Sequence, residues 1–295
     1  LRAVRFSGAV REIGAYAFSK CVMLREIDLS PCDATLGEGA FSECSGLTEV
    51  SLPKGMKAIA KDAFSHTTSL QSVTIPEGVT EIGENAFARS GLTRLALPAS
   101  LRVIGKSAFS SCDGLSSVEL PVGVEVVGDE AFYSCNGLTR VTARGGALTR
   151  IGEHAFAYCS GLAAFDFPEG LREIGGECFS YAAFTGEITL PASLQSLGGA
   201  SFSHCEKITS FEVPASVRRI FSDLDGCHDL VTLSLPHDLE YLSLERNLRS
   251  KPLTVRYDGK RSEWESKEVY LRVKGDAPVT VVSSDGEIKY EKQAR

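Results

Sequence analysis

A glutamate, a histidine and a cysteine lie close together in residues 151–162, which read IGEHAFAYCSGL. His154 follows Glu153 directly and precedes Cys159 by five residues. A histidine that takes the proton of a cysteine thiol creates a nucleophile, so the spacing raises the question of a catalytic pair. Because the chain has nine cysteines and five histidines, half of a metal site is the alternative. The answer depends on the elements that position these side chains.

The chain is built from a repeated unit of about 23 residues. One unit, residues 47–69, reads LTEVSLPKGMKAIAKDAFSHTTS, and a tenth copy has Leu224 where the others have phenylalanine. Such regularity predicts a solenoid, in which no unit buries its apolar face alone and stacked units share one core. The phenylalanines recur 22 to 24 residues apart, at Phe18, Phe41, Phe64, Phe87, Phe109, Phe132, Phe156, Phe179 and Phe202.

Each unit is predicted to begin with a short strand. In residues 47–52 apolar and polar positions alternate, which is typical of a strand with one face inward. A proline such as Pro53 then ends the strand, because it has no amide hydrogen to donate to a neighbour. Stacked strands of this kind are expected to form a parallel sheet, and the phenylalanines a continuous ladder.

The second half of each unit is predicted to be a short helical segment. The apolar residues of 151–159 fall at positions i, i+4, i+5 and i+8, the inward stripe of about two helical turns. A glycine such as Gly161 is expected to permit a left-handed exit toward the next strand. Residues 182–187 (AAFTGE) replace the usual ending of the unit, so a bulge in the backbone is expected there.

The pattern L-x-x-I-x-L-P-x-x-L-x-x-I-G-x-x-A-F-x-x-C resembles the BspA-like leucine-rich-repeat family, over residues 1 to about 250. The resemblance implies an α/β-type solenoid: a curved, right-handed leucine-rich-repeat superhelix. Its parallel β-sheet would lie on the concave face, and short helical segments or turns on the convex face. Residues 1–250 are expected to form this solenoid, degenerate after residue 220. Residues 251–295 look like the C-terminal capping β segment of such arrays, with Trp264 as its plug.

Most cysteines occupy one position of the repeat, which other copies fill with Thr67, Ser90 or Ala182. A small, buried side chain is therefore expected there, and the thiols would point inward side by side instead of toward each other, which favours free thiols. His154 lies in a variable pair that should face solvent, so it and Cys159 are not expected to act together. The cysteines in question are Cys21, Cys44, Cys112, Cys135, Cys159, Cys205 and Cys227.

Two groups of residues near the end of the array contain the residue types of metal ligands. His204–Cys205 and Cys227–His228 suggest zinc, but each histidine flanks its cysteine on the opposite side and the close ligand pairs of zinc sites are missing. Asp223, Asp225 and Asp229 resemble part of a calcium loop that lacks the distal glutamate. No cofactor or metal is predicted, and these three aspartates are the weak metal candidate.

The exposed side of the strands is the predicted ligand-binding surface. It carries hydroxyls and charges with almost no aromatic residues, and solenoids use such extended faces for binding. A merely solvated sheet face is the alternative. The candidate binding residues are Glu26, Asp28, Glu49, Arg94, Glu119, Arg140, Asp166, Glu187 and Glu212.

Charge and hydrophobicity argue against two classes of function, nucleic-acid binding and membrane spanning. The net charge of −7 argues against nucleic-acid binding, which needs clustered lysine and arginine, and no apolar run approaches the ~20 residues of a membrane span. The chain opens with LRAVRF and no signal peptide, which we interpret as the start of a trimmed chain.

The family resemblance implies a bacterial protein, extracellular or on the cell surface, in a family with adhesive members. The resemblance therefore implies a non-enzymatic protein that binds a protein or glycan, such as a host extracellular protein, with adhesion to host proteins or cells as one expected role. The alternatives are a structural spacer without a ligand, or an enzyme or metal site at the degenerate C-terminal repeats.

Overall fold

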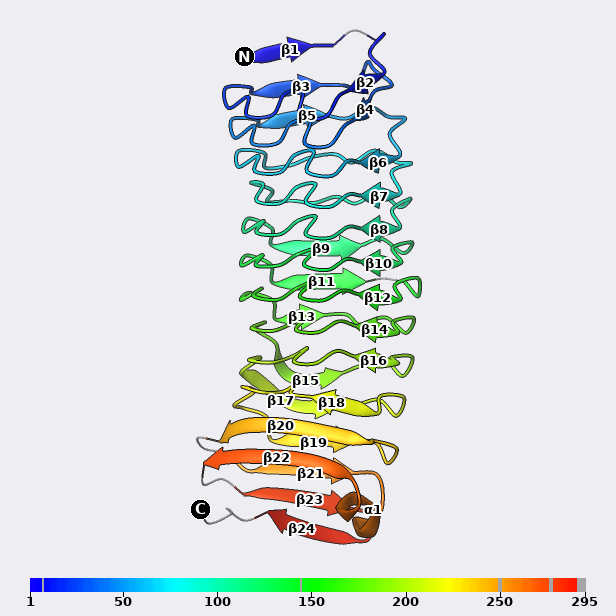
Figure 1. Cartoon of the computed structure of the whole chain (residues 1–295), viewed down its shortest axis with the longest axis vertical. Helices are drawn as coiled ribbons and strands as arrows, with labels where there is room; N and C mark the ends of the chain where they lie inside the picture. The colour runs from blue at the N-terminus through cyan, green and yellow to red at the C-terminus, as the bar shows by residue number, and fades with distance from the viewer. Residues whose placement is uncertain (7, 144, 249–250, 276–277, 291–295) are drawn as a thin grey trace.

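The computed structural model describes residues 1–6, 8–143, 145–248, 251–275 and 278–290. It is a β-solenoid of about 12 coils with parallel strands, stacked into an elongated column that runs nearly straight in the view of Figure 1. Each coil packs against the coils next to it in the sequence, so the two termini lie at opposite ends of the column. The solenoid predicted from the repeats is confirmed.

One strand of each regular coil joins a first column of parallel strands, whose exposed side we call the strand face. The pairing runs in three sheets, β1-β3-β5, β9-β11-β13 and β15-β17-β19-β21-β23-β24, with only β24 antiparallel to its neighbour. The strands are β1 (Ala3–Arg5), β3 (Glu26–Asp28), β5 (Glu49–Ser51), β9 (Ser117–Leu120), β11 (Arg140–Ala143), β13 (Ala164–Phe165), β15 (Thr185–Thr189), β17 (Lys207–Glu212), β19 (Thr232–Leu235), β21 (Leu253–Tyr257), β23 (Val279–Ser283) and β24 (Gly286–Tyr290).

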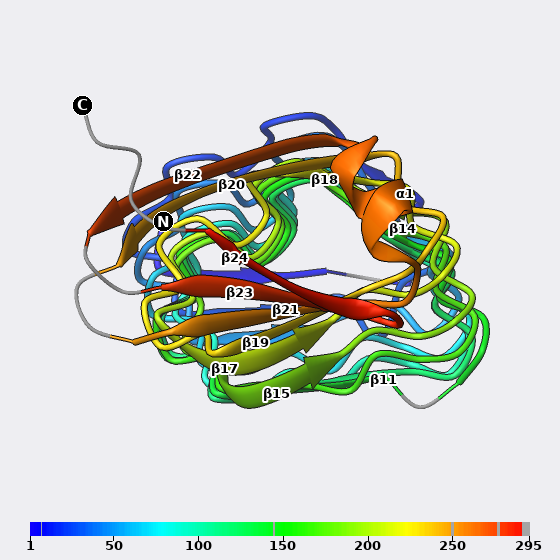
Figure 2. The same ribbon diagram turned by 90° about the horizontal axis from the view of Figure 1, so that it is seen from below.

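A second column of parallel strands follows each proline corner, and the sequence analysis did not predict it. Figure 2 shows the two columns on different sides of the interior. The short helix α1 (Arg261–Glu265) lies near the C-terminal end of the column (Figure 1). The second column consists of β2 (Glu12–Ile13), β4 (Thr35–Leu36), β6 (Ala58–Ile59), β7 (Glu81–Ile82), β8 (Val103–Ile104), β10 (Val126–Val127), β12 (Arg150–Ile151), β14 (Glu173–Ile174), β16 (Ser196–Leu197), β18 (Arg219–Phe221), β20 (Tyr241–Leu248) and β22 (Glu268–Gly275).

The second half of each regular coil is a chain of turns, which the family resemblance allowed, and not the short helix that the residue spacing predicted. In residues 152–159 the amides of Ala157 and Cys159 bond to carbonyls three residues back, whereas the amide of Phe156 donates to Cys178 of the next coil at 2.8 Å. The amides of alternate residues are thus used between coils, so an α-helical ladder cannot form. His154 and Tyr158 adopt left-handed φ values of 53° and 60°, as their counterparts in other coils do. We call these outward-facing turns, one per coil, the turn edge.

The glycines that follow the turn edge do not have the left-handed conformation that was predicted for them. Gly137 and Gly161 have no positive φ. A Cβ atom on Gly137 would lie 2.2 Å from the carbonyl oxygen of Asp113, and one on Gly161 2.7 Å from that of Asn136. Glycine is required there because successive coils approach closely. The left-handed positions are instead on the turn edge, where most of the described residues are not glycine, although Gly39 and Gly226 are.

The phenylalanine ladder is confirmed. Neighbouring rings stack nearly parallel from Phe18 to Phe202, with centroids 5.1–5.6 Å apart. Leu224 continues the buried row at the next coil. Each buried phenylalanine contributes about 2–3 kcal/mol of hydrophobic stabilisation, and the row joins all the coils into one core.

The end of the array departs from the regular repeat. The strand register shifts between Gly186 and Glu187, so the irregularity expected at residues 182–187 is confirmed. Trp264 is buried as predicted, and its indole N–H donates to the Tyr290 hydroxyl at 2.8 Å. The predicted boundary at residue 250 lies outside the described residues, and β21 and β23 continue the strand-face sheet beyond it.

Candidate functional site: the strand face

All nine predicted binding residues lie on the strand face with exposed side chains. Parallel pairing sets them in register, because each strand places the same two positions outward. Glu26 lies opposite Glu49, Thr142 opposite Glu119, and Glu187 opposite Ser210. The structure therefore brings these residues together as one long row, which extends over most of the column.

Their charges are only partly paired. Arg140 and Asp166 form an ion pair, in which Nη2 of the arginine lies 3.1 Å from both carboxylate oxygens. The hydroxyl and amide of Ser30 bond to Asp28 and hold the pKa of its carboxyl below the ordinary value. Within the described part of the chain, no ion pair involves Glu26, Glu49, Arg94, Glu187 or Glu212.

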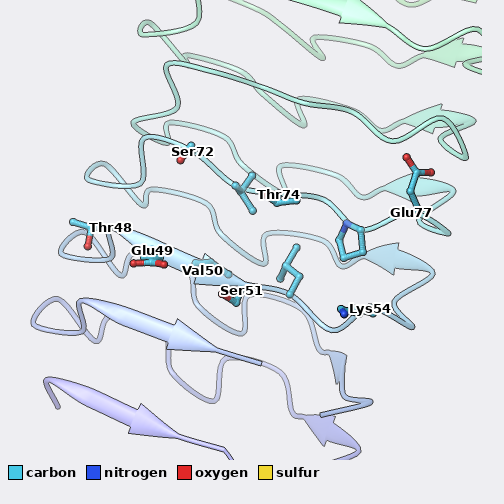
Figure 3. Close-up of a pocket in the computed structure, with 11 residues that line it drawn as sticks. Thr48, Glu49, Val50, Ser51, Lys54, Ser72, Thr74 and Glu77 are labelled. Carbon is cyan, nitrogen blue, oxygen red and sulfur yellow. The ribbon is translucent and has the colours of Figure 1, made fainter. Parts of the chain in front are cut away.

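Two depressions lie on the strand face. The first, near the N-terminal end, has a volume of about 550 Å³ and is lined by residues of two successive coils, including Glu49 and Glu77 (Figure 3). The second has a volume of about 570 Å³ and lies near the C-terminal end, between Glu212 and Arg256. Each depression therefore contains one predicted binding residue, and each has the size of a small-ligand site.

A third depression, on the second strand column, was not predicted. It has a volume of about 420 Å³ and lies between β4 and β6, which do not pair. Its lining is mostly apolar and includes Met56 and Ala60. No sequence signal marked it, because a missing strand pair leaves no trace in the repeat pattern.

His154 and Cys159 are not brought together. The Cys159 thiol is buried and donates to the carbonyl of Phe132 at 3.1 Å. The His154 imidazole lies 3.4 Å from the carboxylate of Glu177 on the turn edge. The two side chains contact different partners on different sides of the backbone, so the stretch IGEHAFAYCSGL is structural.

The cysteine column is inward-facing and all nine cysteines are free thiols. Six of them repeat one contact, in which the thiol donates to the phenylalanine carbonyl of the preceding coil at 3.0–3.3 Å. Burial raises the pKa of Cys44 to about 11 and that of Cys112 to about 12. These thiols are therefore held protonated and unreactive at neutral pH.

The residues of the proposed zinc pair have other contacts. The His204 ring stacks on Tyr181 with centroids 4.4 Å apart, and the Cys205 thiol donates to the carbonyl of Phe179. Cys227 donates to the carbonyl of Phe202. No group of three or more histidine, cysteine, aspartate or glutamate residues that could hold a metal ion occurs in the described residues.

The weak aspartate candidate is not supported either. Asp223 is buried at the place of the alanine that precedes phenylalanine in most coils. Its carboxylate accepts bonds from the amide and hydroxyl of Ser201 and from the amide of Phe221. Burial nevertheless raises the pKa of Asp223 to about 7. Asp229 lies 2.6 Å from the ammonium group of Lys251.

A row of aromatic rings on the turn edge was missed by sequence reasoning. Tyr158 and Tyr181 stack with centroids 4.8 Å apart, His204 stacks on Tyr181, and Tyr133 meets Tyr158 edge to face. The available signal was an aromatic residue just before the cysteine position in consecutive copies. Because the rings cover one another's faces, the row presents mainly its edges to solvent.

Comparisons with known proteins agree with this architecture. Sequence profiles of the BspA type leucine rich repeat region match six copies, over residues 1–93, 34–163, 80–185 and 149–246. No curated protein sequence matches the chain. No helix in the described part of the chain is long and apolar enough to cross a membrane.

Solved structures with the same fold come from bacteria. A leucine-rich repeat protein of Bacteroides ovatus matches with a TM-score of 0.71 at 24% identity, over 90% of this chain and 78% of that one. The pneumococcal vaccine antigen PcpA matches with a TM-score of 0.54 at 17% identity, over 89% and 71%. A leucine-rich repeat protein of Eubacterium ventriosum matches with a TM-score of 0.50 at 17% identity, over 85% and 83%. Since the matched repeats span most of the sequence, the chain belongs to the BspA-type leucine-rich-repeat family.

Proposed function

We propose that this chain is a non-enzymatic interaction protein that works outside the cell or on its surface and binds a protein or glycan through the strand face. The observation that carries the proposal is the long row of exposed, in-register side chains, in which several charged residues have no ion pair within the described residues. Unpaired charges arranged along a surface steer and select an oppositely charged partner. The extracellular location rests on what membership of the family implies.

The buried chemistry supports the same proposal. The thiols and Asp223 are bonded inside the core, so the groups that a catalytic site would use are engaged in packing. The shallow, extended strand face offers contact area over many coils, which suits a macromolecular partner better than a small substrate.

The test is a binding screen of the wild-type chain against immobilised extracellular-matrix proteins and a glycan array. Any binding partner is then measured with a strand-face variant, Glu119→Lys, Glu187→Lys and Glu212→Lys combined. The matched control changes three turn-edge carboxylates, Glu43→Lys, Glu84→Lys and Glu153→Lys. Asp129 and Asp166 are left intact, because both are ion-paired to arginine.

The strand-face variant is expected to lose at least about tenfold in affinity while the control keeps its affinity. Loss in the turn-edge variant alone would place the binding surface on the other side of the coil. An absence of binding throughout the screen would favour a structural spacer.

A further inference from the structure

The strand ladder is interrupted over two coils near the N-terminal end. β5 is the last strand of its sheet and β9 the first strand of the next. The coils between them, residues 70–76 and 92–98, form no strand on this face; they are joined to their neighbours by the isolated bridges Ser51–Thr74 and Thr74–Ala96 and by a bond from the amide of Thr93 to the carbonyl of Gln71. The inward residues Val50 and Val73 are each 6% exposed, so the apolar interior is slightly accessible there.

The first depression lies over this interruption. Its floor is apolar and includes Val50, Leu52 and Val73. Figure 3 shows the two rungs that border it, with Ser51 on one side and Ser72 and Thr74 on the other. None of the hydroxyls of these three residues has a hydrogen-bond partner within the described residues. Hydroxyls and weakly paired backbone groups are thus available to a ligand that lies across the two rungs.

The charges around the depression have one predominant sign. Glu49 and Glu77 line it together with a single lysine, Lys54. Glu26 lies directly opposite Glu49 in the parallel register, although like charges in this arrangement are destabilising. Neither glutamate of that pair has an ion pair in the described part of the chain, so no cation among those residues offsets the repulsion.

We infer that this depression is the docking site of an extended, basic peptide segment of a protein partner. The inference rests on the proposed function and names the chemistry of its ligand. An extended chain directs alternate side chains to opposite sides, so every second residue, a lysine or arginine, faces the carboxylates of Glu49 and Glu77. Its backbone amides and carbonyls bond to the hydroxyls of Ser51, Ser72 and Thr74, which line the depression on both rungs.

The experiment uses a fluorescent peptide of alternating lysine and threonine as the probe. Peptides of alternating glutamate and threonine, and of alternating serine and threonine, are the charge controls. Binding is measured by anisotropy to the wild-type chain and to the double variant Glu49→Gln, Glu77→Gln. The matched control is Glu84→Gln, Glu153→Gln, which removes two exposed carboxylates of the turn edge, outside the proposed binding surface.

The basic peptide should bind the wild type, and the double variant at Glu49 and Glu77 should bind at least about tenfold more weakly. Binding should weaken with added salt, and the control variant should match the wild type. Hydrogen exchange of the amides of residues 70–76 should slow when the peptide is bound, because the peptide covers these residues and restrains their local opening.

Three outcomes would overturn the inference: no binding of the basic peptide, equal binding of the serine–threonine peptide, or equal losses in both double variants. If a partner from the screen loses affinity for the strand-face variant but not for the Glu49 and Glu77 variant, the proposed function stands and this inference fails. A glycan that displaces the basic peptide and protects residues 70–76 would show that the depression takes a saccharide, which also contradicts it.

Discussion

At the scale of single residues, burial determines the role of each group in the stretch IGEHAFAYCSGL. Phe156 is fully buried and stacks between Phe132 and Phe179, so Phe156→Ala leaves a cavity and should cost about 3–5 kcal/mol of unfolding free energy. Cys159→Ser should cost less, about 1–2 kcal/mol, because serine can donate to the same carbonyl. His154→Ala should cost no more than about 0.5 kcal/mol.

Denaturant unfolding of these three variants measures the order of their losses in unfolding free energy directly. Ala200 already adopts the same left-handed conformation as His154, so alanine is tolerated at that position. If His154→Ala proved as damaging as Phe156→Ala, the separation of the imidazole from the core would be incorrect.

Asp223 makes stability depend on pH. Burial raises its pKa in the folded chain to about 7, above the ordinary value of 3.8, so its contribution to stability is fully present below about pH 4. That contribution is lost as the pH rises through about 7, and the total change is at most about 4 kcal/mol for three pKa units. The stability of the wild type minus that of Asp223→Asn should therefore fall between pH 4 and pH 8.

The single tryptophan, Trp264, is buried in the C-terminal coils, and its fluorescence can follow their unfolding at each pH. A difference between wild type and variant that stays constant with pH would show that the Asp223 carboxyl titrates alike in the folded and unfolded chains.

At the scale of the element, the chain at and just after the turn edge contains two kinds of position: one at which glycine cannot be replaced, and one at which glycine can replace another residue. Gly137→Ala would bring a Cβ atom 2.2 Å from the backbone of the preceding coil and should destabilise the chain by about 2 kcal/mol or more. Ala200→Gly removes a Cβ atom from a residue with φ of 60° and should be neutral or stabilising by up to about 1 kcal/mol. Thermal unfolding of both variants tests these two predictions. A larger loss of stability in Ala200→Gly than in Gly137→Ala would contradict the roles assigned to the two positions.

The cysteine column should consist entirely of thiols. Titration of the unfolded chain without reductant is expected to find nearly all nine groups, whereas the folded chain should react mainly at Cys21, the one cysteine that is not buried. Five or fewer thiols in the unfolded chain would mean that neighbouring coils are bridged by disulfides.

These elements show which features a sequence can predict. The strand face and the phenylalanine ladder were predictable, because alternation from Val50 to Leu52 and the recurrence of Phe64 require one inward face. The turn edge was not, because inward residues at i, i+4, i+5 and i+8 satisfy a helix and a chain of turns equally. The two-residue strands of the second column, such as Glu173–Ile174, are too short to show alternation.

At the scale of the whole molecule, the stack creates a surface that no single coil possesses. The exposure of the candidate binding residues could be predicted, since each follows from its place in a strand. The first and third depressions could not, because they lie where strand pairing is incomplete, at residues 70–76 and between β4 and β6. The proposed function belongs to this scale: binding resides in the strand face and not in one reactive group.

Blocking the strand face tests most directly the claim that this face binds the partner. In a Cys21→Ser background the remaining native thiols are buried, so a new surface cysteine can be labelled selectively with a maleimide-linked polymer. Ser117→Cys and Thr189→Cys place the polymer on the strand face, and Glu43→Cys and Glu153→Cys place it on the turn edge; all four positions are exposed. The measured quantity is the affinity for the partner identified in the binding screen, with unlabelled variants as controls. The account predicts that polymer on the strand face abolishes binding and that polymer on the turn edge does not, and full binding by the strand-face conjugates would contradict it.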